Sequence, residues 1–167
     1  MTVRILATGG TFDKRYDPVA GQLTFGTTAV ADLLATAQAR LPVDELLQID
    51  SLDMTDTHRA LVAEACTRVT EDRLVVVHGT DTMVETAAVL AERVVGKTIV
   101  LTGAMVPHSV HESDAAFNLG FALAAAQCLP IGVYVAMHGQ WHDWRQVRKN
   151  RAIGRFEASR TTGPDIA

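Results

Sequence analysis

The sequence predicts an α/β domain with a doubly wound, mostly parallel, five-stranded sheet flanked by helices. Short apolar runs end in glycine, as in Val3-Arg4-Ile5-Leu6-Ala7-Thr8-Gly9-Gly10 and Leu74-Val75-Val76-Val77-His78-Gly79. Continuous runs of this kind are typical of parallel strands covered on both faces. The runs alternate with helical patterns along the chain, which predicts right-handed crossovers and a parallel sheet.

The strand-like runs cover residues 3–8, 45–50, 74–78, 98–102 and 131–137, and each is bounded by Gly, Asp, Ser or Pro. Segments rich in Ala, Leu and Glu lie between them, with apolar residues recurring about every 3.6 positions. We predict that these segments are helices, over residues 28–39, 57–70, 82–94 and 114–127.

Three segments do not fit this alternation and are expected to be loop or edge material: residues 12–26, 106–113 and 141–167. The first contains Asp17-Pro18 and two glycines, with little periodicity. Long irregular connections in compact domains are frequently lids or binding loops. We therefore expect the segment 12–26 to be mobile and to serve a catalytic step.

The composition is that of one globular domain over residues 1–167. Apolar residues make up 48% of the chain and charged residues 20%, within the range of folded proteins. The net charge is −4, and Lys and Arg are scattered until the C-terminal stretch. This pattern argues against a duplex-binding surface with many phosphate contacts, so we expect no nucleic-acid partner.

The cysteines and the amino terminus bear on the compartment. Cys66 and Cys128 lie far apart without CxxC spacing, which makes a disulfide scaffold improbable. The amino terminus enters a strand at once, without the regions of a signal peptide, and no apolar run approaches the roughly 18 residues that span a bilayer. We expect a cytoplasmic protein without membrane contact, although a secreted protein whose signal has been removed would look the same.

Hydroxyl and carboxylate side chains gather where the predicted strands end. A threonine hydroxyl needs a nearby proton acceptor to become a nucleophile, and glycine lets backbone N–H groups approach a developing oxyanion. This combination favours acyl transfer. The residues concerned are Thr8, Gly9, Gly10, Thr11, Ser51, Asp53, Thr80, Asp81 and Thr102.

Structural explanations compete with this interpretation. Thr80 and Asp81 could cap the helix that begins near residue 82, and Ser51 and Asp53 could be turn formers. Gly9-Gly10 could be a tight turn or a phosphate cradle, but neither GxGxxG nor GxxxxGK[ST] is present. Composition alone does not decide between these alternatives.

Two further kinds of site are not supported by the sequence: a metal site formed by histidines and a nucleic-acid stacking site formed by tryptophans. His111-Glu112 is not followed by the second His of an HExxH motif, so we expect no metal site. The other histidines of this group, His108, His138 and His142, are expected to lie in solvated loops. Trp141 and Trp144 indicate a packing edge or an oligomer contact rather than a nucleic-acid stacking platform.

Four motifs stand in order on the predicted elements. They are Thr8-Gly9-Gly10-Thr11, His78-Gly79-Thr80-Asp81-Thr82-Met83-Val84-Glu85-Thr86-Ala87, Leu101-Thr102-Gly103-Ala104-Met105-Val106-Pro107 and Ser113-Asp114-Ala115-Ala116-Phe117-Asn118-Leu119. Together they resemble the TGGT, HGTDTMEETA, TGAMRP and SxDGxxNL motifs of the bacterial-type L-asparaginase family. The resemblance covers nearly the whole chain and implies the flavodoxin/Rossmann-like N-terminal domain of that family.

The resemblance implies hydrolysis of L-asparagine to L-aspartate and ammonia through a covalent β-aspartyl enzyme, without metal or cofactor. Thr11 would be the nucleophile. Tyr16, on the first loop, matches the tyrosine that the family places beside the nucleophile. The loop is shorter here than in the family.

The resemblance also implies how the substrate is held. Trp144-Arg145-Gln146-Val147-Arg148-Lys149 resembles the GRDVxK segment of the family, which makes Lys149 the lysine that pairs with Thr80 and Asp81. Asp81 would bind the α-amino group of the substrate and Ser51 its α-carboxylate. A zwitterionic amino acid needs such opposite partners, and Lys149 would add positive potential to the proton-transfer chain.

The chain also departs from the family pattern. Leu52 stands where the family usually has Gln, Glu or another polar residue, so the substrate is expected to lose one hydrogen bond there. Gly10 completes the expected substrate-binding set, with Ser51, Leu52, Thr80 and Asp81. Two-domain members carry a C-terminal domain that supplies a glutamate to the neighbouring subunit. We expect a short form without it, in which Glu157 and the arginine-rich tail are the remaining material.

Two other functions stay open at this point. A non-catalytic amino-acid-binding or regulatory module could use the same fold, since fold alone does not establish chemistry. An amidase partner in transamidation would need an additional tRNA-facing surface, and we find none in the sequence. A homodimer or homotetramer is expected, because Trp141, Trp144 and Phe156 add more apolar surface than a small domain easily hides.

Overall fold

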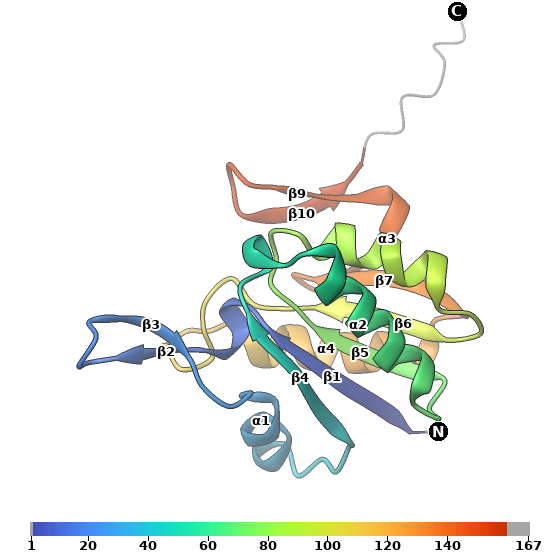
Figure 1. The fold of residues 1–167 in the computed structure, drawn as a ribbon. Helices are drawn as coiled ribbons and strands as arrows, with labels where there is room; N and C mark the ends of the chain where they lie inside the picture. Colours follow the sequence, from blue (N-terminus) through green and yellow to red (C-terminus); the bar gives the residue numbers. More distant parts are fainter. Residues whose placement is uncertain (1, 160–167) are drawn as a thin grey trace, which may run out of the picture.

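A computed structural model describes residues 2–159 of the chain. Its centre is a six-stranded sheet in the order β4-β1-β5-β6-β7-β8 (Figure 1). The strands are β1 (Val3–Gly9), β4 (Val43–Ile49), β5 (Arg73–Val77), β6 (Thr98–Thr102), β7 (Gly132–Met137) and β8 (Gln140–Asp143). The first five pair in parallel, and β8 pairs with β7 antiparallel. The predicted mostly parallel α/β sheet is confirmed, with the edge strand β8 in addition to the five expected strands.

Within the described residues, four helices cover the sheet, two on each face. They are α1 (Val30–Thr36), α2 (Asp56–Arg68), α3 (Met83–Arg93) and α4 (Ala115–Cys128). Side chains alternate along each strand, so Val75 and Val77 pack with α1 and α4, whereas Leu74 and Val76 pack with α2 and α3. The doubly wound arrangement therefore follows from strands that are apolar on both faces.

Helix α1 is shorter than the predicted segment 28–39 because its end is capped early. Gln38 adopts a left-handed backbone, with φ of 54°. The Ala39 N–H donates to the Leu34 carbonyl at 2.8 Å, and the Gln38 N–H donates to the Ala35 carbonyl at 3.1 Å. This pair of bonds is a Schellman motif, which satisfies the last carbonyls and stops the helix.

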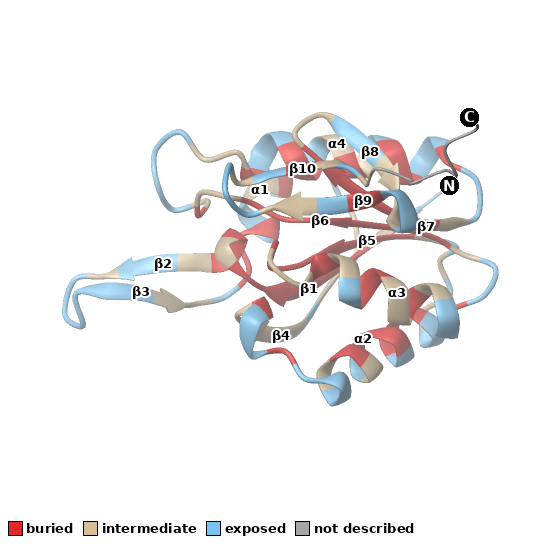
Figure 2. Cartoon of the chain, turned by 90° about the horizontal axis from the view of Figure 1, so that it is seen from above, coloured by how far each residue is buried: buried red, intermediate tan, exposed pale blue. Residues whose placement is uncertain are grey.

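The segment 12–26 is not an irregular loop. It begins with the 3₁₀ turn η1 (Thr11–Asp13) and continues as an antiparallel hairpin of β2 (Lys14–Asp17) and β3 (Gln22–Phe25). The hairpin projects from the body of the molecule, and its tip is exposed (Figures 1 and 2). The prediction failed because Lys14-Arg15-Tyr16-Asp17 has no apolar alternation for a sequence pattern to detect.

The C-terminal segment also contains regular structure, whereas residues 160–167 lie outside the described residues. After β8 come the 3₁₀ turn η3 (Trp144–Gln146) and a second hairpin of β9 (Val147–Asn150) and β10 (Arg155–Ala158). Val147 and Phe156 are buried against the α2 and α3 face. This hairpin is thereby attached to the sheet at the end where β1 and β5 finish.

The apolar edge expected to drive oligomerisation is largely used within the chain. Phe156 is buried, and Trp144 packs partly buried against the same cluster. Trp141 is half exposed and meets the Tyr134 ring edge-on, with centroids 5.8 Å apart. Of these aromatic residues, only Trp141 keeps a large exposed surface.

Two smaller expectations can be compared with the described residues. Cys66 and Cys128 are both free thiols, the first buried and the second exposed. Within residues 2–159, we find no helix with the length and apolar character needed to span a bilayer.

Candidate active site

The carboxyl ends of β1, β4 and β5 converge at the point where the chain reverses its direction across the sheet. In α/β sheets this switch point is where ligands bind. Gly10 has φ of 73°, and a Cβ there would lie 2.4 Å from the Gly79 Cα. A Cβ on Gly79 would lie 2.6 Å from both Cβ and Oγ of Ser51. Because glycine occupies both positions, the turn carrying Thr11 packs directly against Gly79, the residue before Thr80, and Gly79 packs against Ser51 on the turn η2 (Ser51–Asp53).

Lys149 reaches this edge from β9. Its Nζ donates to Thr80 Oγ1 at 2.7 Å and to Asp81 Oδ1 at 3.0 Å. The Lys149 side chain is only 9% exposed, and Thr80 is buried. The β9–β10 hairpin supplies this geometry, since its buried Val147 and Phe156 fix the strand that carries Lys149. The structure thus brings together three of the predicted site residues, Thr80, Asp81 and Lys149.

Arg151 is a second cation at Asp81, and sequence reasoning missed it. Its Nε lies 3.5 Å from Asp81 Oδ1, and its Nη2 donates to the Asp81 carbonyl at 3.2 Å. Arg151 is the first residue of the turn after β9, so no strand or helix periodicity marked it in the sequence. Glu157 instead pairs with Arg148, with Oε1 and Nη2 2.6 Å apart.

The capping explanation for Thr80 and Asp81 does not hold. The residue before α3 is Thr82, which makes no side-chain capping bond, and its hydroxyl donates to the Ser51 carbonyl at 2.7 Å. Turn formation before α2 falls to Asp50, whose Oδ1 accepts the Leu52 N–H at 3.1 Å and caps the turn η2 (Ser51–Asp53). The side chains of Thr80 and Asp81 therefore do not cap α3 and instead accept hydrogen bonds from Lys149.

Ser51 and Leu52 sit side by side on η2 but differ in exposure. Ser51 is buried against Gly79. The Leu52 side chain is 63% exposed and lies at the outer edge of the site. The structure places Ser51 within the converging strand ends and Leu52 at their margin.

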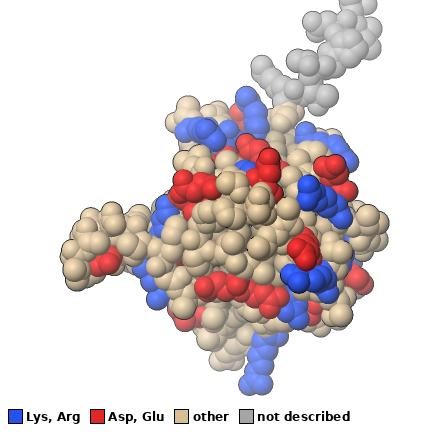
Figure 3. Space-filling view, viewed as in Figure 1, with Lys and Arg blue, Asp and Glu red and all other residues tan. Residues whose placement is uncertain are grey.

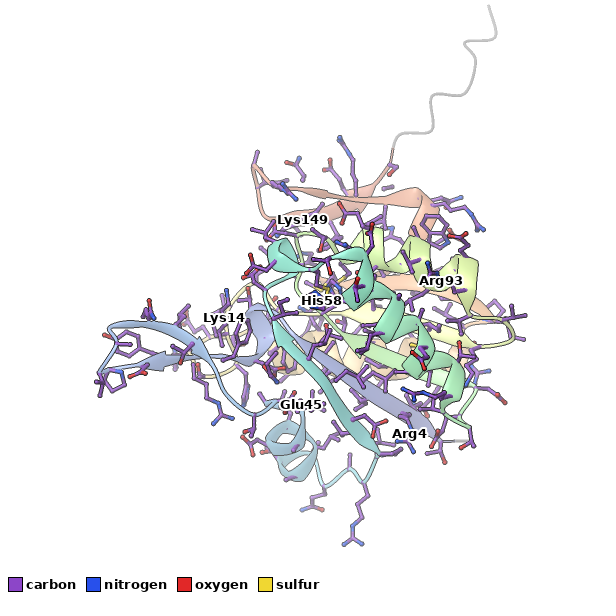
Figure 4. All side chains as sticks on the ribbon, viewed as in Figure 1. Arg4, Lys14, Glu45, His58, Arg93 and Lys149 are labelled. Atoms are coloured by element: carbon purple, nitrogen blue, oxygen red, sulfur yellow. The ribbon has the colours of Figure 1, made fainter. Side chains whose placement is uncertain are left out.

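Lys14 is another charged residue at this edge that the sequence analysis did not select. Its Nζ forms an ion pair with Asp50 Oδ2. Burial acts to raise the pKa of Asp50, but the hydrogen bonds from Lys14 and the Leu52 N–H, with the nearby Lys149 charge, hold it below its ordinary value. Figure 4 shows Lys14 and Lys149 towards one end of the sheet and Arg4 at the other.

Thr11 and Tyr16 occupy different surroundings. Thr11 is half-buried on η1, the turn between β1 and the hairpin. Asp13, on the same turn, is buried and accepts the Thr28 hydroxyl at 2.9 Å and the Ala29 N–H at 2.8 Å with Oδ1. Tyr16 lies on β2 and is 62% exposed. The root of the hairpin is thus fixed beside Thr11, while Tyr16 projects into solvent.

Of the backbone N–H groups in the Gly9-Gly10 turn, that of Gly10 is used within the sheet. This N–H donates to the Ile49 carbonyl at 2.9 Å, so it is already used between β1 and β4. A backbone donor satisfied inside the sheet is not available to a ligand. What Gly10 contributes is the close approach to Gly79.

Two of the strand-end hydroxyls are also structural. Thr8 is buried and donates to the Val77 carbonyl at 2.9 Å, and Thr102 is buried and donates to the Ala136 carbonyl at 2.8 Å. Each bond joins one strand end to the neighbouring strand. These two threonines stabilise the edge and do not face a pocket.

His78 is a buried neutral imidazole under the site. Its Nδ1 lies 2.7 Å from the Gly79 carbonyl, and its Nε2 lies 2.8 Å from Thr86 Oγ1. A carbonyl oxygen can only accept, so Nδ1 carries the proton and Nε2 accepts the Thr86 hydroxyl. Burial lowers the pKa of His78 to about 4, partly offset by the bond to Gly79. The ring therefore fixes the backbone that leads into Thr80.

The start of α4 holds the neighbouring loop. Asp114 accepts the N–H groups of Met105 and Val106 at 3.0 Å. Asn118 is buried, donates to the Gly103 carbonyl at 3.0 Å and accepts the His138 N–H at 3.1 Å. These bonds explain the spacing of the Ser113 to Leu119 motif as a clamp on the loop after β6.

Charges are interspersed on the face that Figure 3 shows, with basic and acidic side chains next to each other. Across residues 2–159, no three His, Cys, Asp or Glu side chains gather in a group that could hold a metal ion. The polar groups brought together at the candidate site are the Thr80 hydroxyl, the Asp81 carboxylate and the Lys149 ammonium.

The chain that carries this site matches a known protein family. The asparaginase N-terminal domain family matches residues 2–161. The chain belongs to the asparaginase family. The thermostable L-asparaginase of Thermococcus kodakarensis superposes with a TM-score of 0.83 at 27% identity, over 95% of this chain and 51% of that structure. The asparaginase-family α/β fold, which is an amidohydrolase fold, follows from both findings.

Other relatives include a second L-asparaginase and proteins named as amidotransferase subunits. The probable cytoplasmic L-asparaginase of Campylobacter jejuni has a TM-score of 0.81 at 29% identity, over 94% of this chain and 52% of that structure. A glutamyl-tRNA(Gln) amidotransferase subunit of Methanococcus maripaludis is 36% identical over 151 residues, which are 84% of this chain and 36% of the relative. The corresponding protein of Aeropyrum pernix is 33% identical over 152 residues, again 84% of this chain and 36% of the relative. The chain thus spans about a third of these curated relatives and about half of the solved asparaginases.

Proposed function

We propose that this asparaginase-family chain is an L-asparaginase that hydrolyses L-asparagine to L-aspartate and ammonia. The observation that carries the proposal is the Lys149 ammonium, which is bonded to both Thr80 and Asp81 beside the turn of Thr11. A buried lysine is costly unless its charge is partnered. A hydroxyl, an ammonium and a carboxylate placed together at the switch point of the sheet suit proton transfer to and from a threonine nucleophile.

The proposed reaction has two displacement steps. Thr11 Oγ1 attacks the side-chain amide carbon, and its proton passes through the Thr80 and Lys149 pair to the leaving nitrogen, which departs as ammonia. A β-aspartyl ester on Thr11 remains. Water then attacks this ester, one proton returns to Thr11 through the same groups, and aspartate leaves. Both steps use the same proton chain, as microscopic reversibility of acyl transfer favours.

The substrate would be held at both ends. Asp81 supplies a carboxylate for the α-ammonium, and Ser51 supplies a hydroxyl for the α-carboxylate. Leu52 gives no polar partner at the margin, so the preference for asparagine over glutamine rests on the other contacts. Tyr16 would join Thr11 only when the β2–β3 hairpin bends towards the sheet, since its side chain is exposed.

A second candidate is an amidase component that works with a partner in transamidation. The 36% identity to the Methanococcus maripaludis amidotransferase protein favours it. In that case ammonia would be released from asparagine or glutamine and passed to a partner. The same nucleophile and proton chain would serve, so the amide substrate and the dependence on a partner separate the two candidates. A non-catalytic amino-acid-binding module is a third possibility.

An ammonia-release assay on the purified protein tests the proposal, with asparagine and glutamine each with and without EDTA. We expect release from asparagine that EDTA does not suppress. Thr11→Ala should lower it at least about 10³-fold while leaving the melting temperature unchanged. The exposed Thr36→Ala on α1 is the matched control and should retain full activity.

Three results would reject the proposal: one from this assay, one from its repetition with a partner protein, and one from a ligand-binding measurement. Normal turnover by Thr11→Ala would remove the nucleophile. Release from glutamine alone, dependent on a partner, would favour the transamidation component. Ligand binding without any release would favour the binding module.

The cellular location and the oligomeric state of the protein are also proposed. The name of the Campylobacter jejuni relative supports a cytoplasmic location. The exposed Trp141 supports a homodimer or homotetramer, and light scattering of the purified protein would test it.

A further inference from the structure

Two short 3₁₀ turns carry the residues proposed to attack the amide and to hold the α-carboxylate. Thr11 begins η1, which follows β1, and Ser51 begins η2, which follows β4. The strands β1 and β4 are parallel neighbours, and the Gly10 N–H bond to the Ile49 carbonyl joins them just before the turns. The distance between the two turns therefore decides how long an amide can lie between Thr11 and Ser51.

Packing limits how closely the two turns can approach each other. A Cβ on Gly10 would lie 2.4 Å from the Gly79 Cα, and a Cβ on Gly79 would lie 2.6 Å from Ser51 Oγ. Because the chain is already in contact at glycine, the turns have no room to move closer. Van der Waals contact opposes their separation only weakly, so a stronger attraction is needed to fix the spacing.

An ion pair between Lys14 and Asp50 joins the two turns. Lys14 Nζ lies 2.5 Å from Asp50 Oδ2. Lys14 directly follows η1, and its N–H donates to the Thr11 carbonyl. Asp50 directly precedes η2, and its Oδ1 accepts the Leu52 N–H at 3.1 Å. Each residue therefore shapes its own turn, and together they hold the turns to each other.

Lys14 is held in place by contacts other than this pair. Its carbonyl accepts the Ser109 hydroxyl at 2.8 Å, and its Nζ lies 5.6 Å from the centre of the Phe25 ring. The Lys14 and Asp50 side chains are 22% and 27% exposed, so solvent screens their attraction less than that of a surface pair. Figure 4 shows Lys14 where the β2–β3 hairpin meets the body of the molecule. The ion pair thus connects η2 to a fixed part of the hairpin root.

We propose that the Lys14–Asp50 ion pair sets the spacing between Thr11 and Ser51 and thereby selects asparagine over glutamine. Glutamine is one methylene longer between its α-carboxylate and its side-chain amide, so it fits only when the turns move apart. Lys14 and Asp50 are positioning residues, because they act through the turns that carry Thr11 and Ser51. This inference rests on the proposed amidohydrolase function and adds what determines the length of its substrate.

The first experiment measures the ratio of kcat/KM for L-asparagine to that for L-glutamine. We expect the wild-type protein to prefer asparagine. Lys14→Met removes the charge and should lower the ratio about tenfold, the lower end of what one methylene contributes to discrimination. Lys14→Arg keeps a cation and should keep the ratio. Arg15→Met is the matched control, because Arg15 pairs with Asp32 on α1 at 3.6 Å, and it should leave the ratio unchanged.

Asp50→Asn tests the other half of the ion pair. Asparagine keeps an oxygen for the Leu52 N–H but removes the charge, so the ratio should fall by the same factor as in Lys14→Met. The double variant should lower the ratio no further, because either change alone removes the whole interaction. Asp50→Asn also tests the inference if Lys14→Met does not fold.

Four results would overturn the inference. An unchanged ratio in both single variants, whether or not turnover falls, would show that the pair only supports the fold. Losses that multiply in the double variant would show that the two residues act separately. A ratio in Lys14→Arg as low as in Lys14→Met would show that the charge is not what sets the spacing. A wild-type preference for glutamine would remove the selection itself.

Binding separates this inference from the proposed reaction. Calorimetry on the Thr11→Ala protein with L-aspartate and L-glutamate measures the selection for length without turnover, and adding Lys14→Met should reduce the preference for aspartate. That result supports the inference even if the wild-type protein releases no ammonia from either amide. Ammonia release from asparagine with an unchanged acid preference upholds the proposed function and overturns the inference.

Discussion

The two regions that carry the predicted catalytic residues differ in how firmly they are held. The strand-end rim, formed by the carboxyl ends of β1, β4 and β5, is buried and joined by the Gly10–Gly79 contact and the bonds of Lys149. The β2–β3 hairpin, which carries Tyr16, projects from the body and is exposed (Figure 2). The contrast teaches that only part of the proposed site is preorganised.

The physical reason for the contrast is the number of supporting layers. Helices on both faces cover the strands that end at the rim, whereas the hairpin has only its own two strands. Two-stranded hairpins are marginally stable in water. What fixes the hairpin is its root, where Asp13 binds Thr28 and Ala29 and Ser109 donates to the Lys14 carbonyl at 2.8 Å. Motion is therefore expected above this root.

Lys149→Met would break the rim and has the largest expected effect. The change keeps the length of the side chain but removes the ammonium that binds Thr80 and Asp81. We expect kcat for asparagine to fall about 10²- to 10⁴-fold, the usual contribution of proton transfer. Steady-state kinetics measure it, with the exposed Arg155→Met on β10 as the control. A rise in KM at unchanged kcat would remove Lys149 from the proton chain.

We expect acid to lower the free energy of unfolding by favouring protonation of His78, which lies under the strand-end rim. Its folded-state pKa, about 4, is below the ordinary 6.5, so stability is full above pH 6.5 and is lost as the pH falls towards 4. The free energy of unfolding should therefore drop by about 2 kcal/mol between pH 7 and pH 5 from this group.

Urea unfolding at the two pH values measures this loss. His78→Asn cannot titrate and should lose the His78 part of the dependence, whereas the exposed His111→Asn should keep it. An unchanged pH dependence in His78→Asn would show that the imidazole is not the group that titrates.

Tyr16→Phe sharpens the comparison from the side of the hairpin. If Tyr16 reaches Thr11 only when the hairpin bends, the lost hydroxyl should lower kcat about tenfold without changing the melting temperature. Val19→Ser, at the exposed tip of the same hairpin, is the control and should not alter kcat. Wild-type turnover by Tyr16→Phe would show that catalysis needs the residues of the strand-end rim and not the Tyr16 hydroxyl.

Leu52→Gln has the smallest expected effect. Leu52 lies at the exposed margin of the rim, so an added amide there should change the ratio of kcat/KM for asparagine and glutamine by about twofold to fivefold. Stability should stay the same because no buried contact is lost. A competition assay with both amides measures the ratio, and an unchanged ratio would place Leu52 outside the substrate pocket.

The elements with strong periodicity were predictable. Residues 98–102 are a strand at the predicted bounds, and α3 starts and ends within one residue of 82–94. The hairpins were missed because charged residues such as Arg15 and Arg148 occupy strands that are half in solvent. A strand of four residues with at most one buried side chain leaves no alternating pattern.

The sequence by itself determined the alternating α/β order, the glycines at the strand ends and the motifs that placed the chain among asparaginases. Tertiary structure alone decided which polar groups are free. It bonded the Gly10 N–H to Ile49, buried the hydroxyls of Thr8 and Thr102 within the sheet, and set Arg151 beside Asp81. The reason is that local sequence fixes backbone preference, whereas hydrogen-bond partners far apart in the chain are chosen only when the strands assemble.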